Sequence, residues 1–239
     1  MKRKILVVIL ASLLLTVFSA PLFSQHTITV KHTYYDVLFD TVFCQGILTH
    51  YTQTVAHHNS PKLARQGSEL TSFHKDNLIP TKFQTVGKSD YANYNKQFKG
   101  DKHNTVDIGH LTPFQAMAFD STAVEETMMF STNTAFQISF FNEQQWRYIE
   151  GVVFDSIAPK YDCEVYTGVL VSLSHPKKYN QVYIPDYYFK VVVFNGKSIA
   201  WLGKNVPENG STKANDALID LAKLKSIILQ YYPNIKLQF

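Results

Sequence analysis

The sequence is short of cysteine, of long apolar runs and of repeats. Its 239 residues include two cysteines, so one disulfide at most can form within the chain. One long apolar run is present, at the very start of the chain. Repeats, low-complexity tracts and a linker that would separate a second domain are all missing. The sequence therefore predicts a single domain over residues 26–239, long enough to bury a large core.

The apolar run, Ile5–Phe18, follows Lys2, Arg3 and Lys4 and precedes small residues. A membrane-spanning helix needs about 20 apolar residues, so this run is short for one. Together these features are typical of a secretory signal peptide over residues 1–25, cut near Ser24 or Gln25. The protein is then expected to be exported, to a periplasm or outside the cell. An uncleaved anchor is the other interpretation.

A strong positive charge is also lacking once that segment is set aside. The whole chain has 23 basic and 19 acidic residues, a formal charge of +4. Without the three basic residues at positions 2–4, 20 basic residues face 19 acidic ones, which leaves +1. Global charge alone would not hold a nucleic acid, so such a partner requires a local basic patch or a metal ion.

The two cysteines, Cys44 and Cys163, both lie in the part expected to be exported. In an oxidising compartment an even number of cysteines favours a disulfide, here one that joins distant segments. Two buried free thiols are the alternative, because free cysteine is readily buried.

Alternating apolar and β-branched residues predict strands over 27–39, 45–54, 164–173, 182–184, 188–195 and 198–202, the last two joined by an Asn195-Gly196 turn. Apolar spacing predicts helices over 141–154 and 214–232. The polar stretch 89–104 contains Lys99 and Lys102 and is expected to be a loop beside a site. These elements indicate an α+β fold with a mixed or antiparallel central sheet and flanking helices.

Three polar residues in the middle of the chain suit phosphodiester cleavage. A neutral imidazole at His110 can deprotonate water near its ordinary pKa of about 6.5. Asn142 offers an amide oxygen of the kind that Mg²⁺ binds, and Glu150 lies two helical turns further on. By themselves these residues are also compatible with a purely structural role.

The motifs around these residues are more specific. Asp107, Gly109, His110, Leu111 and Pro113 form one stretch. Ser131, Asn133 and Gln137 follow, and then Asn142, Trp146 and Glu150. This pattern resembles the DNA/RNA non-specific endonucleases, the sugar-non-specific nucleases with a ββα-metal site. The resemblance spans roughly residues 33–235 and includes the strand–proline–strand region around Pro185.

The resemblance implies a secreted Mg²⁺-dependent enzyme, with Mn²⁺ as a substitute, that cleaves DNA and RNA and leaves 5′-phosphates. It implies His110 as general base, Asn142 as metal ligand and Glu150 as a holder of metal-bound water. Asn133 would place His110 or a phosphate, and Asp107 would orient its neighbours. Three lysines are candidates for substrate binding: Lys99, Lys102 and Lys190.

Two positions depart from the family pattern. Ile108 and Phe154 stand where the family carries arginines. On a strand Ile108 shares a face with His110, so an apolar side chain is expected in the cleft where a phosphate contact is usual. The alternative interpretation that follows is a weakened nuclease fold that binds nucleic acid without turnover.

Overall fold

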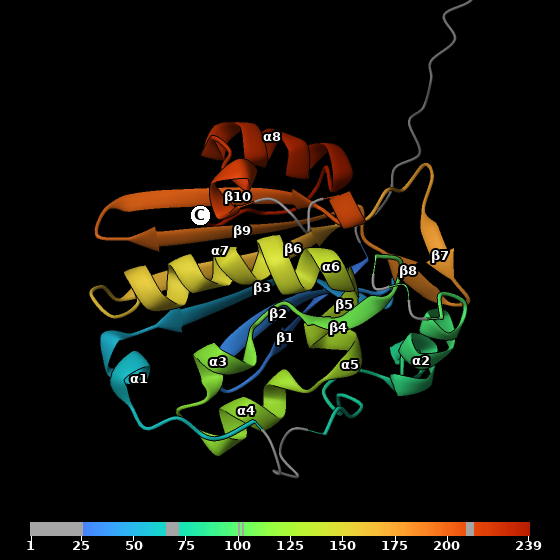
Figure 1. Cartoon of the computed structure of the whole chain (residues 1–239), viewed down its shortest axis with the longest axis horizontal. Helices are drawn as coiled ribbons and strands as arrows, with labels where there is room; N and C mark the ends of the chain where they lie inside the picture. The colour runs from blue at the N-terminus through green and yellow to red at the C-terminus, as the bar shows by residue number, and fades with distance from the viewer. Residues whose placement is uncertain (1–25, 66–71, 100, 102, 209–212) are drawn as a thin grey trace, which may run out of the picture.

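The computed structural model describes residues 26–65, 72–99, 101, 103–208 and 213–239. Its main feature is a six-stranded sheet in the order β1-β2-β3-β6-β9-β10, in which every neighbouring pair is antiparallel (Figure 1). The α+β fold with an antiparallel central sheet is therefore confirmed. Its strands are β1 (Thr27–Lys31), β2 (Tyr35–Asp40), β3 (Gln45–Gln53), β6 (Cys163–Leu170), β9 (Tyr187–Phe194) and β10 (Lys197–Lys204).

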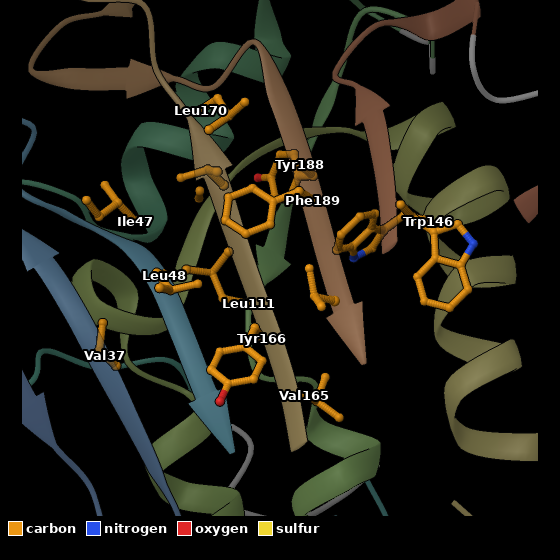
Figure 2. Packing of buried hydrophobic residues seen from close by; sticks show 14 of the residues in the cluster. Val37, Ile47, Leu48, Leu111, Trp146, Val165, Tyr166, Leu170, Tyr188 and Phe189 are labelled. Carbon is orange, nitrogen blue, oxygen red and sulfur yellow. The ribbon is translucent and has the colours of Figure 1, made fainter. Parts of the chain in front are cut away.

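The pleat gives this sheet two different faces. Cross-strand pairs place Tyr51 opposite Val165 and Thr167 opposite Lys190, so these side chains lie on one face. Phe189 and Tyr166 point to the other face. Both faces are buried, and Figure 2 shows the apolar side chains packed around the central strands. Lys190 lies on a central strand within this core. Lysine is almost never fully buried unless it is paired, so the residues of the site above the sheet must account for its burial.

The β9–β10 hairpin agrees with the turn that its sequence predicts. Asn195 and Gly196 both have positive φ, at 45° and 69°, as a two-residue turn of this kind requires. The pairing then continues from Lys197↔Phe194 to Lys204↔Tyr187.

A smaller unit lies against the sheet and carries the motif residues. It consists of the antiparallel strands β4 (Val106–His110) and β5 (Thr134–Ile138), followed directly by a long helical stretch. That stretch runs in front of the sheet (Figure 1) and contains two π-helical segments. Its parts are α6 (Ser139–Phe141), η3 (Asn142–Trp146), α7 (Arg147–Gly151) and η4 (Val152–Ile157).

Short helices and a hairpin complete the described chain. They are α1 (Val55–Asn59), η2 (Thr81–Phe83), α2 (Lys88–Lys96), α3 (Phe114–Met117), α4 (Ser121–Thr127), α5 (Phe130–Asn133), η6 (Ala214–Ala217), α8 (Leu221–Tyr231) and the pair β7 (Lys177–Tyr179) and β8 (Val182–Ile184). In the part of the chain that the structure describes, no helix has the length and apolar character needed to cross a membrane.

Two of the sequence predictions for helices and loops are wrong. The polar stretch 89–104 is not a loop throughout: α2 occupies it as far as Lys96, and turns follow among the described residues. At the start of α2 the Asp90 carboxylate accepts a hydrogen bond from Gly87 N at 2.9 Å and so caps the helix. The C-terminal helix begins at Leu221, not at 214. Asp220 caps it, and Leu218 instead makes a bridge to Trp201 of β10.

The predicted disulfide is also wrong, and both cysteines are free. Cys44 comes just before β3, whereas Cys163 pairs with Gln53 at the far end of that strand. The length of β3 therefore separates the two residues by on the order of 25 Å, while a disulfide needs Cα atoms within about 7 Å. Cys163 is buried, which agrees with the alternative of free thiols.

Candidate active site

A cavity of about 890 Å³ opens where the helical stretch, β4 and the sheet meet. His110, Asp107, Asn142 and Glu150 all line it. They come from two segments about 30 residues apart in the sequence, brought together because β5 turns directly into the helix. Residues of β3, α2, α3 and β9 complete the walls. The cavity is large enough for a small ligand or part of a polymer.

His110 ends β4, and its Nε2 atom is buried without a hydrogen-bond partner in the described chain. Burial, and then the nearby guanidinium of Arg65, lowers the pKa of the His110 imidazole from 6.5 to about 3. The imidazole is therefore neutral at every ordinary pH. The preceding Gly109 is favoured by packing, since a Cβ atom there would lie 2.6 Å from Gln137 Cβ, which is fixed to the backbone of β5.

Asp107 connects the strand to the helix. Its carboxylate accepts a hydrogen bond from Ser139 Oγ at 2.8 Å and another from Asn142 Nδ2 at 2.8 Å. Because the amide nitrogen of Asn142 donates to Asp107, the opposite edge of that amide presents its oxygen away from the carboxylate. Asp107 is thus a positioning residue for Asn142. Ser139, the first residue of α6, serves this contact with its hydroxyl.

Asn133 holds the loop that follows His110. Its Oδ1 accepts from Thr112 N at 2.8 Å, and its Nδ2 donates to the carbonyl oxygens of Thr112 and Thr127, each at 2.9 Å. The side chain is fully buried. These contacts engage both ends of the amide and leave no place for a phosphate. Asn133 therefore acts through the backbone next to His110.

Glu150 and Lys190 form the floor of the cavity. Lys190 is 1% exposed, its Nζ donates to Thr167 Oγ1 at 2.7 Å, and the same atom lies 5.1 Å from the Trp146 ring centroid. Burial lowers the pKa of Lys190 to about 8, opposed by the negative charge of Glu150. Burial raises the pKa of Glu150, opposed by Lys190 and Arg65. The positive charge of Lys190 thus favours the ionised form of the Glu150 carboxylate.

The donor set fits a divalent ion that keeps most of its water. In the described residues no group of three His, Cys, Asp or Glu side chains could cage a metal. Asn142 offers one amide oxygen and Glu150 offers carboxylate oxygens for bound water. His110, whose buried Nε2 has no hydrogen-bond partner among the described residues, lines the same cavity. Mg²⁺ is bound in proteins in this manner, through few protein oxygens and several waters.

The remaining sequence predictions divide between the cavity and the outer surface. Ile108 lines the cavity, half-buried, as expected from its strand register. Phe154 also lines it, with its ring 4.6 Å from that of His58 and 5.6 Å from Lys62 Nζ. Lys99 is exposed and does not line the cavity, and Lys102 lies outside the described residues, as does the predicted signal peptide.

Three cations of the cavity were missed by sequence reasoning: Arg65, Lys88 and Arg147. Arg65 belongs to the segment after α1, and Lys88 begins α2. Arg147 lies one residue after Trp146 and three before Glu150 in the motif helix, so its place beside Glu150 could have been predicted from helical spacing. For Arg65 the sequence contained no such signal.

Comparison with known proteins identifies the family. The model of the DNA/RNA non-specific endonucleases matches residues 17–231, almost the whole chain. The chain belongs to the DNA/RNA non-specific endonuclease family. It is therefore a nuclease of the hydrolase class, and its family substrates are nucleic acids.

A solved structure supports the fold of this endonuclease. A chain from a crystal structure of the EndoG/EndoGI complex, which concerns the mechanism of EndoG inhibition, is 18% identical with a TM-score of 0.64. The match covers 83% of this chain and 82% of that one. At this identity the likeness concerns the fold, a ββα-metal nuclease fold. A search of curated proteins finds no match.

Proposed function

We propose that this endonuclease is exported and hydrolyses DNA and RNA, without strong base preference, with Mg²⁺ held at Asn142 and His110 as general base. One observation carries the proposal: three residues line one cavity, namely His110 with an unpaired Nε2, Asn142 with an amide oriented by Asp107, and Glu150 with a carboxylate. General base, metal ligand and water holder are the three groups that such a hydrolysis needs.

A bound divalent ion would supply positive charge for the phosphoryl oxygens and the leaving oxygen. His110 Nε2 accepts a proton from the attacking water, whose oxygen then bonds to phosphorus. The bond from phosphorus to the 3′ oxygen breaks, and this oxygen takes a proton from a water molecule to become the 3′-hydroxyl, while the phosphate stays on the 5′ oxygen. His110 then gives up its proton to solvent. Glu150 accepts hydrogen bonds from water near Asn142, while Asp107 keeps the Asn142 amide in orientation.

The low pKa of His110 applies to the enzyme without bound substrate. A phosphodiester beside the imidazole brings a negative charge that favours its protonated form, so the pKa rises in the complex and the base becomes stronger. The acid limb of kcat/KM, which reports the free enzyme, should then lie at a lower pH than the acid limb of kcat. This replaces the simpler expectation of a single rise near pH 6.5.

The decisive experiment measures nicking of supercoiled plasmid, and cleavage of a structureless RNA, with Mg²⁺ and with EDTA. We expect EDTA to abolish cleavage and His110→Ala to lower the rate by about 10²–10⁴-fold. His175→Ala is the matched control, because His175 is exposed and outside the cavity. If the wild type shifts DNA in a gel without nicking it, the protein is the non-catalytic binder and the proposal fails.

Two further measurements test the finer points. If the products have 5′-phosphates, polynucleotide kinase will label them only after phosphatase treatment; direct labelling would contradict the assignment. N-terminal sequencing of the protein from the periplasm or medium should begin close to residue 25. An intact Met1 on membrane-bound protein would contradict the predicted export.

A further inference from the structure

Exposed lysines follow one edge of α2 and begin at the rim of the active-site cavity. Lys88 and Ala92 are one helical turn apart, and both are exposed and line the cavity. Lys96 is exposed one further turn along the same edge and lies outside the cavity. The turns that follow the helix carry Lys99, which is exposed as well. Together Lys88, Lys96 and Lys99 form a lysine row that leads out of the cavity.

The helix that carries this row is fixed to the strand that carries His110. Asn95 of α2 bonds to both backbone groups of Val106 on β4: its Oδ1 accepts from the nitrogen at 2.7 Å, and its Nδ2 donates to the oxygen at 2.8 Å. Tyr91 of the same helix is buried, with its ring centroid 4.2 Å from that of Phe136 on β5. The lysine row therefore has a fixed place relative to the base.

No carboxylate pairs with the lysine row in the part of the chain that the structure describes. Lys96 Nζ donates to Asn93 Oδ1 at 3.2 Å, a neutral partner that leaves its charge uncompensated. The same segment contains Asp90 and Asp101, and both carboxylates accept hydrogen bonds from its own backbone N–H groups. In a chain of nearly neutral overall charge, a local basic row of this kind is what a nucleic-acid partner requires.

The opposite way out of the cavity is acidic. Figure 1 shows α2 and α7 on opposite sides of β4. A second cavity of about 770 Å³ runs along α7 and η4 and adjoins the first, because Arg147 and Glu150 line both. Glu143 and Asp155 also line it, so three carboxylates accompany one guanidinium there. A phosphate backbone is therefore repelled along α7 and attracted along α2.

The spacing of the lysine row suits a nucleic-acid strand. Lys96 follows Lys88 by eight residues, which corresponds to about 12 Å along the helix axis at 1.5 Å per residue. The phosphates of one strand follow each other at about 3.4 Å along a duplex axis. The distance from the cavity rim to Lys96 thus corresponds to about three or four nucleotides.

We propose that Lys96 and Lys99 bind backbone phosphates of the nucleic acid beyond the cavity, so that the strand leaves the active site over α2 and not along α7. This inference rests on the proposed nuclease function, which places the cut at His110. The two lysines hold the polymer and take no part in the reaction, so their contribution should appear in affinity and its salt dependence.

The first test measures binding of a labelled DNA duplex in EDTA, which removes the ion needed for cleavage, across a salt titration. The variants are Lys96→Gln/Lys99→Gln, its charge-preserving counterpart Lys96→Arg/Lys99→Arg, and the matched control Lys197→Gln/Lys223→Gln, which removes two exposed lysines of β10 and α8 outside the cavity. The first variant should reduce the salt slope by about 1.8, or about 0.9 per contact, and weaken binding at least about tenfold at low salt. The other two should bind like the wild type.

The second test compares cleavage of duplex DNA and of bis(p-nitrophenyl) phosphate, a small diester without flanking phosphates. Lys96→Gln/Lys99→Gln should raise KM for the duplex at least about tenfold and leave kcat/KM for the small diester unchanged. Asp155→Asn should change duplex binding by less than about threefold, because the strand does not pass along η4. Melting temperatures should agree across the set, because the substituted side chains of the lysine row are exposed.

Three results would overturn the proposal: an unchanged salt slope in Lys96→Gln/Lys99→Gln, an equal change in the Lys197→Gln/Lys223→Gln control, or an equal loss on the small diester. Tighter binding by Asp155→Asn, by more than about threefold, would place the strand along α7 and overturn the path over α2. A wild type that binds DNA with the expected salt dependence and does not cleave it with Mg²⁺ would overturn the nuclease function alone, so the two failures are distinguishable.

Discussion

Removal of the Asp107 carboxylate should weaken metal binding more than it weakens the fold. In Asp107→Ala the Nδ2 of Asn142 loses the acceptor that now lies at 2.8 Å, and the amide becomes free to rotate its oxygen out of the site. A hydrogen bond to a charged group contributes about 1.5–3 kcal/mol, and loss of a partner behind a metal ligand lowers affinity by about 10–100-fold. These two figures agree, because tenfold corresponds to about 1.4 kcal/mol.

The matched control is Ser139→Ala. It removes the other donor to the same carboxylate, at 2.8 Å, and leaves the contact to Asn142 intact. The assay is the initial rate of plasmid nicking across a Mg²⁺ titration, with the melting temperature of each variant. We expect the midpoint to rise about 10–100-fold in Asp107→Ala and by less than about threefold in Ser139→Ala. Equal midpoints in wild type and Asp107→Ala would refute the positioning role.

Three other predictions concern acid stability, thiols and the cavity wall. His110 is neutral when folded down to a pH of about 3, whereas an unfolded histidine takes up a proton below about 6.5. The free energy of unfolding should therefore fall as the pH drops through this window, and His110 should account for a loss of roughly 2 kcal/mol at pH 5. His110→Asn should remove that part of the loss. Urea unfolding curves that shift equally between pH 7 and pH 5 in wild type and in His110→Asn would contradict this prediction. Thiol titration in denaturant without reductant should find two free thiols, Cys44 and Cys163. A titration that finds no free thiol would show that the chain adopts another arrangement. Ile108→Arg should raise kcat for DNA cleavage, because a guanidinium at this position of the cavity wall offers donors to the phosphoryl oxygens. An unchanged kcat at an unchanged melting temperature would argue that position 108 is not directed at the phosphate.

The sequence by itself determined the strands and the residues of the motif. Local alternation predicted most strands of the sheet, Asn195-Gly196 predicted the β9–β10 turn, and apolar spacing predicted the helix around Asn142, whereas the sheet was expected to be either mixed or antiparallel. His110, Asn142 and Glu150 by themselves were also compatible with a structural role. The spacing of the whole motif, which resembles the DNA/RNA non-specific endonucleases, was what singled them out. The shared face of Ile108 and His110 required only the period of a strand.

What the sequence could not supply were the relations between segments distant in the chain. Cys44 and Cys163 were expected to bond, yet the register of β3 against β6 places them at opposite ends of a strand. Lys190 was a candidate for substrate binding, but its strand lies inside the sheet, so its side chain is buried, where its charge acts on Glu150. Arg65 lies at the site because the segment before it is fixed to the end of α3, where Leu63 N donates a hydrogen bond to Ala118 O. Local propensity acts over a few residues, whereas burial, pKa and the meeting of charges depend on which segments the tertiary packing brings together.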